Sequence, residues 1–411
     1  MMLKTRRQLK GPSSFRDGIM VLSGMLATLI IVWCFPSSMP PSFNLPVMST
    51  ITDNENVTTF YDEPDFSYVM DKPIKNWDEK RQEWLTAHPS VSRSVERVVM
   101  VTGSQPKPCR SPVGDYLHLR LFKNKVDYCR IHGHDIFYNT VLLHPGMFGF
   151  WAKYPVVKAA MLAHPEAEWI WWVDSDAVFT DMDFSLPLEK YKNYNLIVYG
   201  WPDTLYRQKS SMGLNAGVFL IRNCQWSMNF LERWASFGPQ TENYAKWGQL
   251  QMSTFTDKTD SRSDDQAALC YMVLVEKEIW ADKFHLETEY FFQAYFMDVI
   301  GNFEDAKDHY AEIEKKEPEL RRRHAEKFGG GYRALLKEYL DNTDTPVNLR
   351  RPFVTHFTGC EPCNGDRNPI YTLEQCQGGM LRALNLGDSQ VLRNFGYTRS
   401  NLLNSSSVEP L

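Results

Sequence analysis

Short apolar runs alternate with stretches of helical periodicity along the central part of this 411-residue chain. Five apolar runs predict buried strands, at 97–101, 134–138, 169–173, 195–200 and 214–221. Helical patterns lie between them at 116–133, which ends in glycine, and at 153–164. Because strands that alternate with helices usually form a parallel sheet covered by helices, this order predicts an α/β fold with a mostly parallel sheet.

One of the predicted strands ends in a pair of carboxylates. The apolar run 169–173 (WIWWV) is followed directly by Asp174, Ser175 and Asp176. Two carboxylates at positions i and i+2, where a chain leaves a strand, can reach one divalent cation, and oxygen ligands suit Mg²⁺ or Mn²⁺. Asp-Ser-Asp is also common in surface turns, which is the alternative explanation. The tryptophan-rich strand before the pair favours the metal site.

Two further strands carry residues suited to ligand binding. The first strand leads into a Gly/Ser loop, a common nucleotide position in an open α/β sheet. The last of the five runs begins with an Asn-Ala-Gly segment, where glycine lets a ligand approach the backbone. The candidate residues of these two segments are Thr102, Gly103, Ser104, Asn215, Ala216 and Gly217.

Polar residues also cluster at a predicted helix start and in a late strand. A helical pattern over 267–277 is preceded by Asp264, Asp265 and Gln266. Helix capping explains one of these carboxylates, but not the cluster of two carboxylates and an amide. His356 lies in the apolar run 353–357; a lone histidine in a strand is usually structural, but here it precedes a Gly/Cys/Pro loop. We therefore expect His356 to be a third metal ligand beside Asp174 and Asp176.

The N-terminus has the pattern of a membrane anchor. Basic residues occur throughout 1–18, and 19–35 is almost entirely apolar. Since no basic residue follows until Lys72, the charge asymmetry places 1–18 in the cytosol and the body in a lumen. A cleaved signal peptide is the alternative. We expect a lumenal stem and N-terminal extension at 36–93, a catalytic domain at 94–400 and a tail at 401–411.

Charge, cysteines and sequons agree with a lumenal body. The net charge of −5 and the pI of about 6.1 give no indication of a nucleic-acid partner. Asn56 and Asn404 begin glycosylation sequons. Seven of the eight cysteines lie outside the anchor, so some disulfides are expected, although spacing does not give their pairing. The alternative for the C-terminal cysteines is a zinc site made of His356, Cys360, Cys363 and Cys376.

The chain resembles glycosyltransferase family 34, in particular its plant branch. The resemblance rests on long motifs at 102–106 (TGSQP), 123–138 (KNKVDYCRIHGHDIFY), 169–182 (WIWWVDSDAVFTDM), 214–227 (LNAGVFLIRNCQWS), 263–269 (SDDQAAL) and 351–360 (RPFVTHFTGC). It implies a GT-A fold behind an N-terminal transmembrane helix, in a single-pass type II protein of the Golgi membrane. It also implies a retaining transferase that adds an α-1,6-linked sugar to a β-1,4-glycan.

Two plant activities share this family, galactosylation of mannan from UDP-galactose and xylosylation of glucan from UDP-xylose. The segment 356–371 (HFTGCEPCNGDRNPIY) is more similar to the galactomannan galactosyltransferases, so we predict UDP-galactose and a β-1,4-mannan acceptor, with the xyloglucan activity as the alternative. A non-catalytic subunit and a lumenal sugar-binding protein are less favoured, because neither needs this set of carboxylates. Assembly with itself or with other Golgi glycan synthases is also implied.

The resemblance assigns roles to the candidate residues. Asp174, Asp176 and His356 would hold Mn²⁺, or Mg²⁺, and Ser175 and Lys153 would lie beside the diphosphate. Thr102, Gly103, Ser104 and Gly359 would line the nucleotide, and Asn215, Ala216 and Gly217 the donor sugar. Asp264, Asp265 and Gln266 would face the anomeric carbon and the acceptor.

Retention leaves two routes open: a carboxylate attacks the anomeric carbon and is then displaced, or the acceptor attacks from the face that UDP leaves.

Three positions depart from the family pattern. Glu361 replaces Lys or Gln next to the expected diphosphate loop, so it points away from the site or weakens donor binding. Ser211 and Met212 replace a Trp-Thr pair, which alters acceptor fit.

Overall fold

The computed structural model describes residues 63, 66–92, 96–321 and 329–411. These residues belong to one compact unit, Thr59–Leu411. The predicted anchor at 19–35 and the sequon at Asn56 lie outside the described residues. In the part of the chain that is described, no helix has the length and apolar character needed to cross a membrane.

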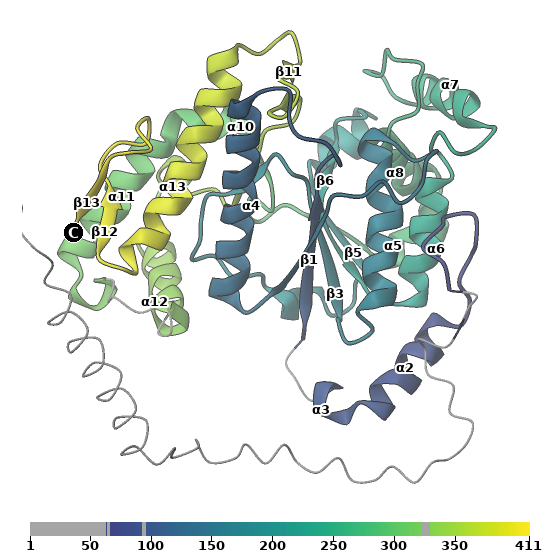
Figure 1. The fold of residues 1–411 in the computed structure, drawn as a ribbon, viewed down its shortest axis with the longest axis horizontal. Helices are drawn as coiled ribbons and strands as arrows, with labels where there is room; N and C mark the ends of the chain where they lie inside the picture. Colours follow the sequence, from purple (N-terminus) through teal and green to yellow (C-terminus); the bar gives the residue numbers. More distant parts are fainter. Residues whose placement is uncertain (1–62, 64–65, 93–95, 322–328) are drawn as a thin grey trace, which may run out of the picture. The chain divides into compact units, whose positions relative to one another are not determined.

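A six-stranded sheet with the order β2-β1-β3-β6-β5-β7 forms the centre of this unit (Figure 1). Its strands are β1 (Val98–Gly103), β2 (Asp135–Asn139), β3 (Trp169–Val173), β5 (Leu196–Gly200), β6 (Leu214–Arg222) and β7 (Phe284–Glu287). The strand β6 runs antiparallel to its neighbours β3 and β5, whereas the other adjacent pairs are parallel. The predicted α/β fold with a mostly parallel sheet is therefore confirmed.

Helices cover both faces of the sheet, α4 one face and α5, α6 and α8 the other (Figure 1). The described α-helices are α2 (Trp77–Ala87), α3 (Pro89–Ser92), α4 (Pro112–His132), α5 (Lys153–Ala163), α6 (Gln225–Ala235), α7 (Tyr244–Thr254), α8 (Asp265–Val275), α9 (Lys277–Trp280), α10 (Phe296–Val299), α11 (Phe303–Lys316), α12 (Gly329–Asn342) and α13 (Gly379–Arg393). The helix α4 begins four residues before the pattern predicted, because Ser111 caps it and accepts a hydrogen bond from the Gly114 amide at 3.2 Å.

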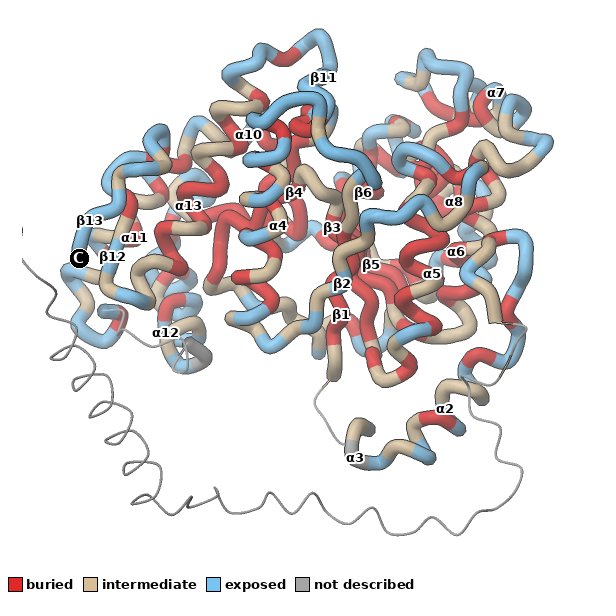
Figure 2. The backbone as a smooth tube through the Cα atoms, in the orientation of Figure 1, coloured by how far each residue is buried: buried red, intermediate tan, exposed pale blue. Residues whose placement is uncertain are grey.

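Alternation along the strands divides the core between these two faces. Val99 and Val101 of β1 pack with α5, α6 and α8, whereas Val98 and Met100 pack with Tyr128 of α4. The central strands β1, β3, β5 and β6 are buried almost throughout, as Figure 2 shows for the centre of the unit, whereas the edge strand β2 is partly exposed. A sheet buried on both faces explains why the strands appear in the sequence as continuous apolar runs.

Three small sheets complete the unit. The strand β9 (Val354–His356) lies between β4 (Ala177–Phe179) and β8 (Ala294–Tyr295). The predicted late strand at 353–357 therefore belongs to this three-stranded sheet and not to the central one. The strands β10 (Cys360–Glu361) and β11 (Asp366–Arg367) form a short ribbon. The strands β12 (Tyr397–Arg399) and β13 (Val408–Pro410) form another, which includes the end of the predicted tail.

The described part of the predicted stem packs on the α/β unit. Trp77 of α2 is fully buried, and its indole Nε1 donates to Asn223 Oδ1 at 2.8 Å. The buried ammonium group of Lys158 donates to the carbonyls of Val69 at 3.0 Å and Lys72 at 2.8 Å. A buried tryptophan and a buried lysine thus attach the segment that precedes β1 to the helical face of the sheet.

Candidate active site

The Asp-Ser-Asp turn lies where three strands meet. It joins the end of β3 to the start of β4, so its residues follow a fully buried strand. The amide of Asp174 donates to the Gly217 carbonyl of β6 at 2.8 Å. The strand β9 pairs antiparallel with β4 and places His356 opposite Ala177, directly after the turn. Strand pairing therefore brings together residues that lie about 180 positions apart in the sequence.

Asp174, Asp176 and His356 form a cluster with the composition of a metal site. Their ligand atoms lie within 4.8 Å of one another. His356 Nε2 is 3.2 Å from Asp176 Oδ1 and 3.7 Å from Asp174 Oδ2. Adjacent corners of an octahedron with bonds of about 2.1 Å are about 3 Å apart, so a small inward movement would fit these atoms around a divalent cation. Two carboxylates and an imidazole suit Mn²⁺ or Mg²⁺ in kind.

The surroundings of the His356 imidazole determine its burial, its pKa and which ring nitrogen faces the carboxylates. Its side chain is 2% exposed. Burial alone would lower the pKa of His356, but the neighbouring Asp176 and Asp174 carboxylates outweigh it and raise the pKa. The other ring nitrogen, Nδ1, is buried and has no hydrogen-bond partner among the described residues. The carboxylates therefore face Nε2, which is the nitrogen available to a cation.

Gly217 leaves the space that this cluster occupies. A Cβ atom added there would lie 2.5 Å from Asp174 Oδ2 and 3.0 Å from His356 Nε2, and closer still to His356 Cε1. The sequence pattern indicated a close approach of a ligand to this glycine. In the structure the side chains of Asp174 and His356 fill that space, so the cluster itself requires glycine at this position.

Lys153 links the cluster to the start of α8. Its ammonium group lies 2.8 Å from Asp265 Oδ2 and 3.6 Å from Asp174 Oδ1, and it donates to the Ala216 carbonyl at 3.0 Å. Burial lowers the pKa of Lys153, but the Asp174 and Asp265 carboxylates overcome this and raise it. Trp172 Nε1 donates to the same Asp174 oxygen at 2.6 Å. Lys153 thus remains charged and fixes two carboxylates relative to each other.

The adjacent Asp264 and Asp265 have different surroundings. Asp264 is the N-cap of α8: its Oδ1 accepts the Ala267 amide at 2.7 Å and its Oδ2 pairs with Lys258. Asp265 is 7% exposed and faces Lys153. Burial raises the pKa of Asp265, while Lys153 opposes that rise. Asp264 therefore has a complete structural explanation, and Asp265 is the carboxylate that belongs to the cluster.

Gln266 and Asn215 extend the site along one edge. Asn215 Nδ2 lies 3.4 Å from Gln266 Oε1, and Asn215 Oδ1 accepts the Gly217 amide at 2.8 Å. Gln266 Nε2 donates to the Ser211 carbonyl at 3.1 Å and contacts Met212 Sδ at 3.4 Å. Two of the three positions that depart from the family pattern, Ser211 and Met212, therefore contact a predicted acceptor residue, and Met212 is 62% exposed.

The loop predicted at 102–106 begins two residues later than expected, because Thr102 and Gly103 are the last residues of β1 and pair with β2. Thr102 is fully buried, so its side chain has no surface to offer a nucleotide in this structure. A Cβ on Gly103 would lie 2.6 Å from the Asn139 carbonyl, so β2 requires glycine here. Ser104 is partly exposed, and its amide donates to the same carbonyl at 3.0 Å. Ser104 is therefore the one of the three whose side chain can reach a ligand.

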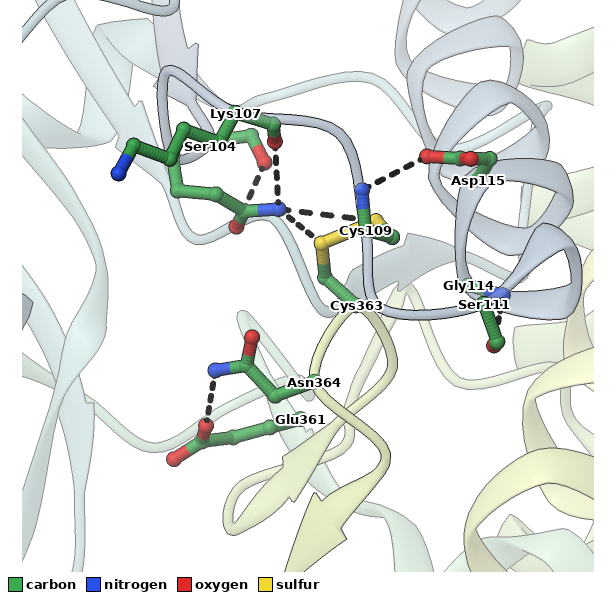
Figure 3. The surroundings of a disulfide bond; sticks show 10 residues. Ser104, Lys107, Cys109, Ser111, Gly114, Asp115, Glu361, Cys363 and Asn364 are labelled. Carbon is green, nitrogen blue, oxygen red and sulfur yellow. Dashed lines mark hydrogen bonds between the residues drawn. A yellow bond between two sulfur atoms is a disulfide. The ribbon is translucent and has the colours of Figure 1, made fainter.

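A disulfide joins this loop to the segment that follows His356. Cys109 pairs with Cys363, 254 residues away (Figure 3). A second disulfide joins Cys360 to Cys376. The alternative zinc site at the C-terminal cysteines is therefore wrong, because its three cysteines are in disulfides. Gly359, at the start of this segment, has a φ of +77°, a conformation that favours glycine.

Glu361 is held within its own loop. Its side chain is exposed, and its Oε2 accepts a hydrogen bond from Asn364 Nδ2 at 3.0 Å (Figure 3). This contact engages the Glu361 carboxylate within the loop 361–364.

Sequence reasoning missed Lys125, a buried lysine of α4. Its ammonium group donates to the carbonyls of Ser175 at 3.0 Å and Ala177 at 2.7 Å, on either side of Asp176. Burial lowers the pKa of Lys125 to about 8, although the Asp176 and Asp174 carboxylates act in the opposite direction. A lysine on the apolar side of a predicted helix, in register with Leu117, Leu121 and Tyr128, was the available signal.

Comparison with known proteins identifies relatives over the whole chain. The sequence profile of the galactosyl transferase GMA12/MNN10 family matches residues 94–367. The chain is 50% identical to galactomannan galactosyltransferase 1 of Cyamopsis tetragonoloba, over 100% of this chain and 98% of that protein. It is 51% identical to glycosyltransferase 6 of Arabidopsis thaliana over 96% and 94%. Xyloglucan 6-xylosyltransferase 1 of Arabidopsis thaliana is 41% identical over 84% and 68%.

Proposed function

The chain belongs to the galactosyl transferase GMA12/MNN10 family, and from this we propose that it transfers galactose from UDP-galactose to a β-1,4-mannan in an α-1,6 linkage, with retention at the anomeric carbon. The predicted family membership is confirmed, and the protein is a glycosyltransferase. Full-length similarity to a galactomannan galactosyltransferase at 50%, against 41% for a xyloglucan xylosyltransferase, supports galactose and mannan over the alternative pair.

The observation that carries the proposal is the cluster of Asp174, Asp176 and His356, linked through Lys153 to Asp265. We propose that the cluster holds Mn²⁺, or Mg²⁺, and that the domain has the GT-A fold. The cation, when bound, offsets the charge that develops on a diphosphate leaving group. The side chains of Asp174 and Asp176 supply the oxygen ligands, and His356 supplies Nε2. A subunit without catalytic activity would have no need for this arrangement.

Lys153 and Asp265, beside the cluster, have separate roles in the proposed reaction. Lys153 keeps Asp174 and Asp265 at a fixed separation, and its positive charge lies next to the expected diphosphate. Asp265 is a nucleophile in the double-displacement route, and in the front-face route it stabilises positive charge on the sugar. The ion pair with Lys153 at 2.8 Å makes Asp265 a weaker nucleophile but leaves it a good electrostatic partner. This supports the front-face route.

Asn215, expected beside the donor sugar, and Gln266, expected to face the acceptor, meet at one edge of the site. Their side-chain amides are hydrogen-bonded to each other, and the Gln266 amide also donates to the Ser211 carbonyl. We propose that the galactosyl acceptor contacts this edge, so that the exposed Met212 next to it affects which glycan binds.

We further propose a type II Golgi membrane protein anchored by 19–35, with the catalytic unit in the lumen and a glycan on Asn404. Asn404 is exposed in the turn between β12 and β13, where a glycan has room.

A matrix of donors and acceptors tests the proposed reaction. Full-length protein purified in detergent is incubated with UDP-galactose, UDP-xylose or UDP-glucose and with manno- or cello-oligosaccharides, in Mn²⁺ or in EDTA. Galactose transfer to mannan oligomers that EDTA abolishes is the expected result. Xylose transfer to cello-oligomers would place the protein with the xyloglucan enzymes. Folded protein that transfers no sugar in any combination would contradict the proposal and favour a non-catalytic subunit.

A further inference from the structure

Lys125 is a buried cation beside the metal-ligand cluster whose charge is not used by an ion pair among the described residues. It lies in α4, on the face of the sheet opposite to Lys153, and is 1% exposed. Its hydrogen bonds go to two main-chain carbonyls, those of Ser175 and Ala177. Burying a lysine costs free energy that an apolar side chain of similar length would avoid. A role other than packing would explain why the position holds lysine.

The two carbonyls that Lys125 binds lie on either side of Asp176. The Asp176 carbonyl between them accepts the Phe357 amide at 3.2 Å, directly after His356. Three consecutive carbonyls of the turn are therefore fixed, two by α4 and one by the strand that carries the third ligand. The direction of the Asp176 side chain depends on this backbone, and its Oδ1 is 3.2 Å from His356 Nε2.

We propose that Lys125 is a positioning residue for the metal: by holding the backbone on both sides of Asp176, it sets the distance between the Asp176 carboxylate and His356 that a divalent cation requires. The inference rests on the proposed function, because it presupposes that the cluster binds a metal. Partners that orient metal ligands usually contribute about 10- to 100-fold in metal affinity. Lys125 contacts neither donor nor acceptor in this account and acts through the turn.

The charge of Lys125 has the opposite effect on metal binding. An ammonium group near a divalent cation repels it, so removal of the charge alone would tighten metal binding. The positioning role predicts the reverse, since a loosened turn presents Asp176 poorly. The sign of the change in Mn²⁺ affinity on loss of Lys125 therefore distinguishes positioning from a purely electrostatic influence.

The test is a Mn²⁺ titration followed by electron paramagnetic resonance on full-length wild type, Lys125→Met and Lys158→Met. Lys158 is the control, because it is also fully buried and donates to two main-chain carbonyls away from the cluster; unlike Lys125 it also pairs with a carboxylate, that of Glu232, at 3.1 Å. We expect Lys125→Met to raise the Mn²⁺ dissociation constant at least tenfold, with kcat at saturating Mn²⁺ changed far less. Lys158→Met should lower the melting temperature and leave the Mn²⁺ dissociation constant unchanged.

Three results would overturn the inference: unchanged affinity in Lys125→Met, tighter binding in Lys125→Met, or equal weakening in Lys158→Met. If Lys125→Met does not fold, Lys125→Gln, which keeps an N–H donor group on a shorter, uncharged side chain, replaces it in the comparison. Asp176→Asn separates this inference from the proposed function. Wild type that binds Mn²⁺ no better than Asp176→Asn would refute the metal site and the role of Lys125 together, whereas Asp176-dependent binding that is insensitive to Lys125 would refute only the latter.

Discussion

Replacement of Gly217 by alanine should disable the site while the fold survives. A Cβ there would lie 2.5 Å from Asp174 Oδ2, whereas ordinary contacts begin at 3.4 Å, so the carboxylate has to move by about 0.9 Å, the difference between the two. The His356 ring, which is closer still to the new atom, has to move as well. We propose both side chains as metal ligands. Either of them can avoid the new Cβ atom only by moving out of the cluster.

The expected loss of transfer rate follows from how little metal–ligand distances can vary. Metal-ligand distances vary by only about 0.2 Å, and misplacement of reacting groups by about 1 Å costs about 100-fold in rate. We therefore expect Gly217→Ala to lose about 100-fold or more in sugar transfer at a given Mn²⁺ concentration. Overpacking of this kind costs about 1–3 kcal/mol of folding stability, which leaves most domains of this size folded.

The assay compares transfer rate and Mn²⁺ affinity in Gly217→Ala and in Gly301→Ala. Gly301 has no atom within 4 Å of an added Cβ, so its substitution controls for the loss of a glycine without a clash. Normal Mn²⁺ affinity and normal transfer in folded Gly217→Ala would refute the reasoning, because they would show that the space opposite Gly217 is not needed by the two ligands.

Three further experiments probe other parts of the structure. Asp265→Asn should reduce transfer by about 100-fold or more, measured as kcat, whereas Asp264→Asn, which preserves an N-cap, should cost less than tenfold; equal losses would contradict the division between them. Trp77→Ala should destabilise the unit by about 3–5 kcal/mol, seen as a lower melting temperature, because it empties a fully buried site; an unchanged melting temperature would show that the segment before β1 is dispensable. Cys109→Ser with Cys363→Ser should raise the KM for the sugar nucleotide and lower stability by about 2–5 kcal/mol, whereas an unaltered KM would leave the disulfide a purely structural role.

Local patterns predicted the fold and the two carboxylates of the candidate metal cluster, Asp174 and Asp176. The continuous apolar runs identified the strands because a sheet buried on both faces leaves no alternation to confuse them. The abrupt change from Val173 to Asp174 marked the end of a strand, where polar side chains can gather. His356 was predicted as a ligand from its loop and from the resemblance, and the structure brings it to Asp176 by pairing β9 with β4.

What the sequence did not show depends on contacts between distant segments. The pairing of Cys109 with Cys363 spans 254 residues, and cysteine spacing does not define such pairs. Asp264 and Asp265 are adjacent and identical in type, and only the positions of Lys258 and Lys153 distinguish a cap from a member of the cluster.

Anomalous diffraction at the manganese edge, from crystals grown with Mn²⁺ and UDP, tests the central claim most directly. The account predicts a single strong peak bonded to one oxygen of Asp174, one oxygen of Asp176 and Nε2 of His356, with the diphosphate on its open side. A complex in which UDP is bound and no manganese peak lies among these three side chains would contradict it.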